Sequence, residues 1–508
     1  MYKYNNIPIF LKDVKKIVEL VKSTLGPKGM DKILLSKNGN FQVTNDGATI
    51  LKNALFDSLA LNIIRDVCNV QDEEIGDGTT SVCCLIGELI SEAERLRSIQ
   101  IHPQLIIKGF RIATKKTLNI IESKSFDYSN DPLRFCLEIL NVVRTTLNSK
   151  IISPFREHFS RIVVKAVLKL KGSTNINFIK IIKKCGGSLK DSFIEDGYIL
   201  EKKNGISQPK KIENARILIA NTSMDTDKIK IYGAQIRVKT ISRLAEIEVA
   251  EQKKIFDKCK KIISHKINVF INRQLIYNRH ERFFMEHGIL TIEQADFEGV
   301  ERLALATGAE IVSTFDIPSK IKLGKCKIVE EILVGEEPMT RFSGCSNGDM
   351  CTIILRGANF QILDEAERSL HDALCVLGQV IRDPRLVWGG GNIEAHIARE
   401  LENFSKKIPG KTALAIESFS KSIQGIPRIV SKNAGLDSID LINKIKNAQE
   451  EGQEKACLDL NKGDIGKADE LGLIESSKLK AQLVISAAEA AEMIIRIDHQ
   501  FSEKTPEN

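Results

Sequence analysis

The segment 76–81 constrains the fold of this chain more than any other, because it must form a tight loop that leads directly into a helix. It reads Gly-Asp-Gly-Thr-Thr-Ser, and apolar residues then recur every third or fourth position from Val82 to Leu96. This spacing predicts a helix that begins near Thr79. The free N–H groups at the start of such a helix favour an anion, and Asp77 offers a hard oxygen ligand for Mg²⁺. The structural alternative is an ordinary turn with a hydroxyl side chain as the helix cap.

Size and composition are those of a globular protein with about three domains. Hydrophobic residues make up 43% of the 508 positions and charged residues 28%. No apolar run is long enough to span a bilayer and no signal-peptide pattern is present, so we expect a cytoplasmic protein without a membrane partner. Eleven cysteines without a CxxC pair predict reduced thiols rather than disulfides or zinc ligands. The net charge of +8 is interleaved with acids and accompanies no nucleic-acid module, which argues against a nucleic-acid partner.

Two further loops in the first fifty residues resemble segment 76–81 in character. An amphipathic helix predicted over residues 11–25 ends at Leu25-Gly26-Pro27, where backbone N–H groups should be free. Strand-like runs at 32–35 and 41–43 then flank Asn38-Gly39, a strong hairpin signal. The hairpin leads into Thr44-Asn45-Asp46-Gly47, a second carboxylate-glycine turn before a helical run. Each loop alone also fits a structural helix stop or turn.

The rest of the chain alternates in character. Helical segments at 133–147 and 154–171 flank Lys150. Strand-like and helical runs then alternate between about 206 and 357, which predicts an α/β domain without an obvious catalytic cluster. A long amphipathic helix is expected at about 359–381, followed by Trp388 and the triple glycine 389–391. From 393 onward the pattern is mainly helical, except for a strand-like alternation at 494–497.

Taken together, the loops at 25–29, 44–47, 76–81 and 389–391 resemble the chaperonins, which are ATP-driven double-ring folding machines. The resemblance covers nearly the whole chain. The hydroxyl-rich form of the 76–81 loop and the Asn-Asp-Gly turn are similar to the eukaryotic cytosolic, group II type. Longer stretches resemble one particular subunit of that chaperonin, namely 70–82, 101–109, 270–277 and 362–377.

This resemblance implies a multidomain α+β chaperonin subunit. Its mostly helical equatorial domain would bind ATP, a small intermediate domain would act as a hinge, and an α/β apical domain with a helical lid protrusion would bind substrate. The expected boundaries are 1–132 and 388–508 for the equatorial domain, 133–205 and 358–387 for the intermediate domain, and 206–357 for the apical domain with its protrusion at about 236–263.

The resemblance also implies roles for individual residues. Asp77 matches the Mg²⁺ ligand, and Asp372 matches the carboxylate that deprotonates the attacking water. Asp46 matches a second catalytic carboxylate at the γ-phosphate, and Glu475 the acid that accepts a ribose hydroxyl. The other positions implied to contact ATP or ADP are Leu25, Gly26, Pro27, Gly47, Gly76, Gly78, Thr79, Thr80, Ser81, Lys150, Gly390 and Gly391.

The implied function is ATP-dependent folding of unfolded cytosolic proteins, with actin and tubulin as typical clients. The implied partners are paralogous subunits in a hetero-oligomeric double ring, eight to a ring. The alternative is a catalytically weak subunit of the same fold that serves structure or client binding, although the intact Asp77, Asp46 and Asp372 favour hydrolysis. A P-loop kinase is disfavoured because no GxxxxGK[ST] motif occurs. Two departures from the family pattern are a short segment before Leu11 and Lys432, where relatives often carry an acid.

Overall fold

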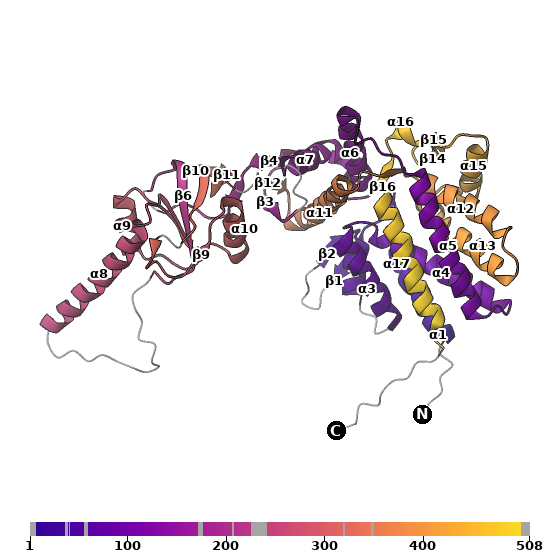
Figure 1. Ribbon diagram of the computed structural model, residues 1–508, viewed down its shortest axis with the longest axis horizontal. Coiled ribbons are helices and arrows are strands. Elements are labelled where there is room, and N and C mark those ends of the chain that lie inside the picture. The colour runs from indigo at the N-terminus through magenta and orange to yellow at the C-terminus, as the bar shows by residue number, and fades with distance from the viewer. Residues whose placement is uncertain are drawn as a thin grey trace, which may run out of the picture. The chain divides into compact units, whose positions relative to one another are not determined.

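The computed structural model describes residues 7–35, 39, 41–54, 59–170, 176–205, 208–224, 241–318, 321–346 and 350–498. The chain forms two compact units (Figure 1). Unit 1 comprises Met1–Val167 and Asn359–Asn508, and unit 2 comprises Leu168–Ala358. The middle of the chain is therefore inserted into a unit that both ends build. Asn38 of the expected hairpin turn, the first residues of the expected protrusion (236–240) and the segment before Ile7 lie outside the described residues.

Unit 1 is mainly helical because its apolar residues recur at helical spacing. In α4 (Thr79–Ser98), Val82, Leu85 and Leu89 are fully buried, and they pack in one cluster with residues of α1, α3, α5, α13 and α17. Burying one such side chain contributes about 1.5–3 kcal/mol. Figure 1 shows α17 lying beside α4 and α5. The other helices that build this unit are α1 (Ile7–Lys22), α2 (Gly47–Asn53), α3 (Leu59–Glu74), α5 (Pro103–Lys124), α6 (Pro132–Leu147), α7 (Arg156–Lys169, along which the chain passes into unit 2), α11 (Phe360–Arg382), α12 (Asn392–Ser405), α13 (Lys411–Ile423), α14 (Gly425–Asn433), α15 (Ser438–Glu450), α16 (Ala468–Leu471) and α17 (Ser477–Arg496).

Short strand pairs join the helices of unit 1. The expected hairpin is confirmed as β1 (Lys32–Leu35) and β2 (Phe41–Thr44) in antiparallel register. Two antiparallel pairs were not predicted: β13 (Leu386–Trp388) with β16 (Ile474–Ser476), and β14 (Ala456–Asp459) with β15 (Asp464–Lys467). Strands of three or four residues carry too little alternation to be recognised.

The strand-like interpretation of residues 494–497 is wrong. Ile494 and Ile495 belong to α17 and are buried in the core, and the helix continues to Arg496. Ala487, Ala490 and Ala491 occupy the preceding turns of the same buried face. The helical period of the whole segment therefore outweighs a four-residue alternation.

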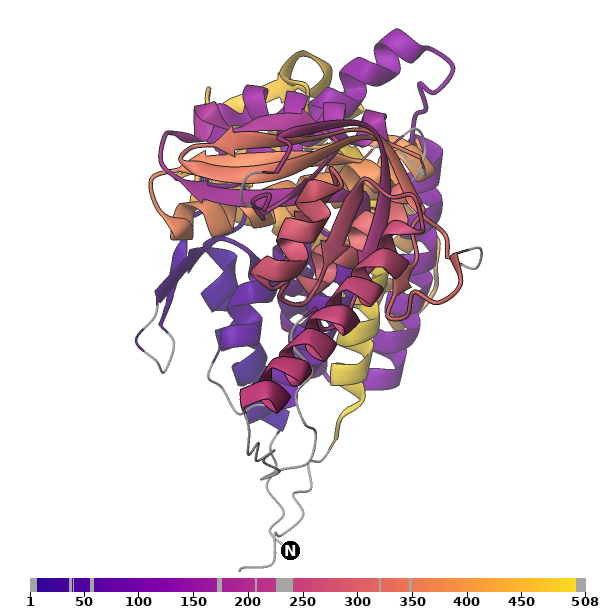
Figure 2. The ribbon, with the colours of Figure 1, turned by 90° about the vertical axis from the view of Figure 1, so that its left-hand side faces the viewer.

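Unit 2 has the expected α/β character. Its larger sheet has the strand order β5-β11-β10-β6-β7-β8, with β9 also paired to β6, and a smaller sheet has the order β3-β12-β4. The long antiparallel strands β10 and β11 were not predicted. Figure 2 shows α8 as a long helix that runs away from the strands of this unit. The elements of unit 2 are β3 (Ile179–Cys185), β4 (Phe193–Asp196), β5 (Tyr198–Leu200), β6 (Lys211–Ala220), α8 (Ile241–Ile263), β7 (Val269–Asn272), α9 (Asn278–Glu286), β8 (Leu290–Ile292), α10 (Phe297–Thr307), β9 (Ile311–Val312), β10 (Gly324–Val334), β11 (Glu337–Cys345) and β12 (Cys351–Gly357). Single 3₁₀ turns occur at Ile176–Phe178 and Leu189–Asp191 in unit 2, and at Ser153–Phe155 in unit 1.

The two compact units are a coarser division than the three expected domains. α6 and α11, both expected in the intermediate domain, lie in unit 1, whereas β3 and β5 lie in unit 2. The separate intermediate domain therefore stays a prediction. The cysteines are free thiols, as expected. Within the described ranges, the helices are too short or too polar to cross a membrane.

Candidate active site

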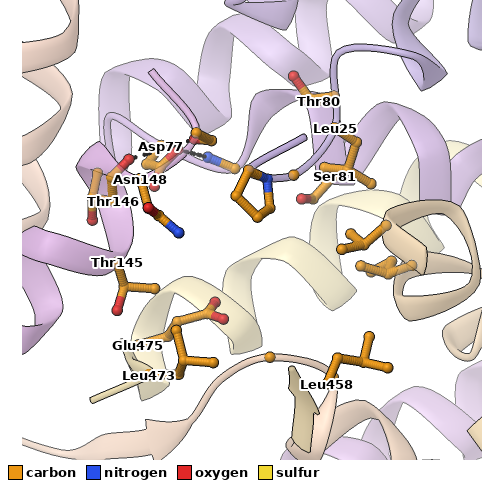
Figure 3. Close-up of a pocket in the computed structure, with 18 of the residues that line it drawn as sticks. Leu25, Asp77, Thr80, Ser81, Thr145, Thr146, Asn148, Leu458, Leu473 and Glu475 are labelled. Carbon is orange, nitrogen blue, oxygen red and sulfur yellow. Dashed lines mark hydrogen bonds between the residues drawn. The ribbon is translucent and has the colours of Figure 1, made fainter. Parts of the chain in front are cut away.

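A cavity of about 560 Å³ in unit 1 brings the glycine-containing loops together. This volume lies in the range of small-molecule sites. In Figure 3, Asp77, Thr80 and Ser81 lie on one side of the cavity, and Leu473 and Glu475 lie opposite them. The predicted residues that line the cavity are Leu25, Gly26, Pro27, Asp77, Gly78, Thr79, Thr80, Ser81, Lys150, Gly390, Gly391 and Glu475.

Four predicted site residues lie behind this lining rather than in it. Asp46 Oδ1 accepts a hydrogen bond from Thr79 Oγ1 at 3.1 Å. A Cβ on Gly47 would lie 2.7 Å from Thr80 Oγ1, and one on Gly76 would lie 2.9 Å from Cys375 Sγ on α11. Asp372 reaches the site through Lys150. These four residues therefore support the residues that face the cavity.

The loop before α4 leaves the start of that helix uncapped. Gly76 and Gly78 have φ values of +79° and +83°, which L side chains rarely adopt. Gly78 is the N-cap residue and no side chain caps the helix. The hydroxyl-cap alternative is therefore wrong, and the helix begins at Thr79 as predicted. Asp77 Oδ1 accepts from the Gly78 N–H at 2.7 Å, while the backbone N–H groups of the first turn remain for an anion at the cavity.

Replacing Gly76 with alanine is expected to destabilise unit 1 because of both φ and space. The new Cβ would overlap the Cβ of Cys375. Gly435 provides a matched control, since its φ is +75° and no atom lies within 4 Å of an added Cβ. We expect Gly435→Ala to cost about 1 kcal/mol and Gly76→Ala roughly 1–3 kcal/mol more, measured by denaturant unfolding. Equal losses in the two variants would contradict the close packing of α11 on this loop.

A buried ion pair joins the loop after α6 to α11. Lys150 Nζ lies 2.7 Å from Asp372 Oδ2, and the two side chains are 9% and 12% exposed. Burial raises the pKa of Asp372 to about 7 against the effect of the Lys150 ammonium, and Asp46 and Asp77 add to the rise. Burial alone would lower the pKa of Lys150, but attraction to these three carboxylates outweighs it and raises the pKa. One ammonium thus faces three carboxylates, which leaves the cluster net negative.

Asp46 is engaged as a helix cap. Its carboxylate accepts from the N–H groups of Ala48 at 3.2 Å and Thr49 at 2.9 Å, and from the Thr49 hydroxyl at 2.7 Å. Burial would raise the pKa of Asp46, but Lys150 and these hydrogen bonds hold it below its usual value. Asp46 is therefore held as a carboxylate in a fixed position next to Thr79.

The opposite wall contains a charged triad of which the sequence had suggested one member. Lys480 Nζ lies 2.5 Å from Glu475 Oε2 and 2.8 Å from Glu394 Oε1. Burial raises the pKa of Glu475 despite Lys480, and Glu394 adds to the rise. Lys480 and Glu394 also line the cavity. No local signal marked them, because an acid with a lysine five residues later is a common pattern.

Asn433 fixes the Leu25-Gly26-Pro27 loop. Its Nδ2 donates to the carbonyls of Lys22 and Leu25, each at 2.9 Å. A Cβ on Gly26 would lie 3.2 Å from Val430. The neighbouring Lys432, singled out in the sequence, does not line the cavity. α14 therefore positions this loop through an asparagine that sequence reasoning passed over.

The described residues contain no group of three or more His, Cys, Asp or Glu side chains that could hold a metal by themselves. Asp77 is instead a single carboxylate in the part of the cavity wall that residues 77–81 form. This arrangement suits Mg²⁺, which is commonly held by one or two carboxylates together with waters and phosphate oxygens.

An uncapped helix start, a carboxylate between glycines and a buried Lys–Asp pair lie around one cavity, an arrangement that can hold an anion and a cation together. The TCP-1/cpn60 chaperonin family model matches residues 17–505, and the chain belongs to this family. The chain is also similar to individual proteins named T-complex protein 1 subunit beta. It is 53% identical over 485 residues to that of Homo sapiens (95% of this chain, 91% of the relative), and 52% identical over 484 residues to those of Dictyostelium discoideum (95% and 91%) and Arabidopsis thaliana (95% and 92%). The chain is thus a chaperonin subunit, and the resemblance to one particular subunit is confirmed as the beta subunit.

Proposed function

We propose that this chaperonin subunit binds and hydrolyses ATP in the cavity of unit 1. The observation that carries the proposal is the convergence of the uncapped start of α4, Asp77 and the Lys150–Asp372 pair on one cavity. Phosphoryl transfer depends mainly on positioning and charge stabilisation, and these groups supply both. Glu475 on the opposite wall is the acceptor for a ribose hydroxyl.

Magnesium fits the residues present, because the cluster of three carboxylates around one ammonium is net negative and Asp77 faces the cavity. When bound, the metal would neutralise charge on the phosphates. The N–H groups of Thr79 to Ser81 would donate to phosphate oxygens. Lys150 holds Asp372 and keeps further N–H donors for a phosphate. Because Asp372 lies behind Lys150 and does not line the cavity, it would accept a proton from the attacking water through one bridging water.

We further propose that this subunit works with paralogous subunits in a hetero-oligomeric double ring in the cytosol. Similar proteins are named as subunits of the T-complex protein, and the sequence resemblance implies the double ring. Unit 2 would bind unfolded client chains such as actin and tubulin. ATP hydrolysis in unit 1 would drive their encapsulation by timing the opening and closing of the chamber.

The test uses assembled rings in which every partner subunit carries alanine at the position equivalent to Asp372. Phosphate release then reports this subunit, and photolabelling of the chain with 8-azido-ATP reports binding. Release together with labelling supports the proposal. Labelling without release supports the alternative of a catalytically weak subunit, and the absence of both overturns an ATP site.

Replacing Glu475 with glutamine is expected to weaken ATP binding about tenfold, because a hydrogen bond to a charged acceptor contributes about 1.5–3 kcal/mol. For the ATP analogue that lacks the ribose hydroxyl bound by Glu475, the variant and the wild-type protein should have nearly the same affinity. The measurement is competition with 8-azido-ATP by ATP, 2′-deoxy-ATP and 3′-deoxy-ATP. Glu394→Gln removes the other partner of Lys480 and controls for general disturbance of the triad. An equal loss for all three nucleotides would contradict ribose recognition by Glu475.

A further inference from the structure

One face of α11 carries a row of polar side chains that contacts several loops of unit 1. Glu365, Arg368, Asp372, Cys375 and Gln379 are three or four residues apart, a spacing that places them on one side of a helix. Only Asp372 belongs to the catalytic group described above. The others raise the question of what holds this helix in its position at the site.

At the N-terminal end of the row, Glu365 and Arg368 hold the turn after β2. Arg368 Nη1 donates to Thr44 Oγ1 at 3.1 Å, and the N–H of Asn45 donates to Glu365 Oε1 at 3.4 Å. Thr44 Oγ1 also accepts from the N–H of Asp46 at 3.1 Å. Two charged side chains on α11 are thus bonded to the residues immediately before Asp46.

In this ion pair Glu365 is buried and Arg368 is partly buried, so the pair differs from a fully exposed surface ion pair. Glu365 is 3% exposed and Thr44 is fully buried. Arg368 Nη2 lies 3.2 Å from Glu365 Oε2. With its amide oxygen turned to the guanidinium, Gln42 accepts from both terminal nitrogens of Arg368, at 2.9 and 2.8 Å. Such a forked contact depends on the planar guanidinium and is not reproduced by lysine.

At the other end of the row, Gln379 and Cys375 contact the end of α3 and the loop before α4, which leads into the cavity wall formed by residues 77–81. Gln379 Nε2 donates to the carbonyl of Glu74 at 2.7 Å, and its Oε1 accepts from Lys478 Nζ at 3.0 Å. Cys375 packs against Gly76 without room for a side chain there. α11 is therefore fixed on both sides of Asp372.

We propose that Glu365 and Arg368 are positioning residues that fix Asp372 relative to Asp46 for hydrolysis. Glu365 lies two helical turns before Asp372, about 10 Å along a rigid helix. The same pair holds the turn that carries Asp46, so the contacts of Glu365 and Arg368 fix the positions of both carboxylates relative to Lys150. Neither Glu365 nor Arg368 lines the cavity. Their loss should therefore slow the reaction without weakening nucleotide binding. The inference rests on the proposed ATP hydrolysis.

The test measures kcat and KM for ATP in the same rings with inactivated partner subunits. Arg368→Gln should lower kcat about 10–100-fold with KM changed less than about twofold, because a small misplacement of a reacting group costs this much in rate. Arg368→Lys should restore only part of the rate. Glu367→Gln, which removes a carboxylate from another side of the same helix, is the matched control and should stay within about twofold.

The interaction with Asp372 separates positioning from a general structural role. Arg368→Gln should cause no further loss when added to Asp372→Ala, because the base whose distance from Asp46 the pair fixes is then absent. A further loss in the double variant, or a parallel rise of KM, would overturn the inference. If Arg368→Gln rings do not assemble, Thr44→Val replaces that variant, because it removes the hydroxyl that accepts from both Arg368 and the Asp46 N–H. It should likewise lower kcat while KM stays nearly unchanged.

The proposed function and this inference fail in different ways. Unchanged phosphate release in Asp372→Ala would overturn the assigned base, and with it this inference. A large loss in Asp372→Ala together with normal rates in Arg368→Gln and Thr44→Val would overturn only the positioning role.

Discussion

Asp372→Ala is expected to slow ATP hydrolysis by at least about 100-fold while ATP binding changes less than about twofold. General base catalysis contributes typically 10²–10⁴-fold. Asp372 lies behind Lys150 and does not line the cavity, so its removal should spare the contacts that hold the nucleotide. The measurement is single-turnover phosphate release from rings with inactivated partner subunits, with 8-azido-ATP labelling for binding.

Two variants besides Asp372→Ala make this experiment specific. Asp372→Ala leaves a buried Lys150 without its nearest carboxylate, so a loss of stability is expected as well. Asp372→Asn keeps the shape and a hydrogen-bond acceptor for Lys150, and should be nearly as inactive with less destabilisation. Glu367→Gln removes a carboxylate from another side of α11 and serves as the control. Normal turnover in Asp372→Asn would rule out this carboxylate as the base.

Asp77→Ala is expected to abolish the Mg²⁺ dependence of nucleotide binding and to slow hydrolysis by at least about 100-fold. Asp77 is the only side-chain carboxylate in the part of the cavity wall formed by residues 77–81, and its position is fixed by the 2.7 Å hydrogen bond from the Gly78 N–H. In the wild-type protein, a divalent cation held by Asp77 would stabilise the negative charge of the phosphates by several kcal/mol, and the variant would lose this stabilisation. The check compares nucleotide affinity with Mg²⁺ and with EDTA, alongside phosphate release.

The control for this prediction is Asp66→Ala, which removes an exposed carboxylate from α3. It should leave both affinity and turnover within about twofold. If Asp77→Ala retained the wild-type difference in affinity between Mg²⁺ and EDTA, the metal assignment would be wrong. If only hydrolysis fell, Asp77 would be required for the reaction but not for holding the metal in the complex with nucleotide.

Local chemistry explains which elements could be predicted. α4 begins at Thr79 as expected, because Gly76 and Gly78 adopt a backbone that other residues resist and apolar spacing follows at once. The β1–β2 hairpin and α11 follow from equally local signals. The missed pairs β13–β16 and β14–β15 and the misassigned residues 494–497 depend on packing partners that short windows do not contain.

The sequence alone determined the glycine loops and the start of α4, because these depend on backbone sterics and short-range spacing. The motifs in these loops also carried the resemblance to a known family. Only the tertiary structure decided that Lys150 lies against Asp372 across 222 positions of sequence, and that Lys480 joins Glu475 to Glu394. It also decided that Glu365 and Arg368 hold the turn before Asp46. These contacts form because burial of the helical core brings distant segments together, and buried charges then require partners.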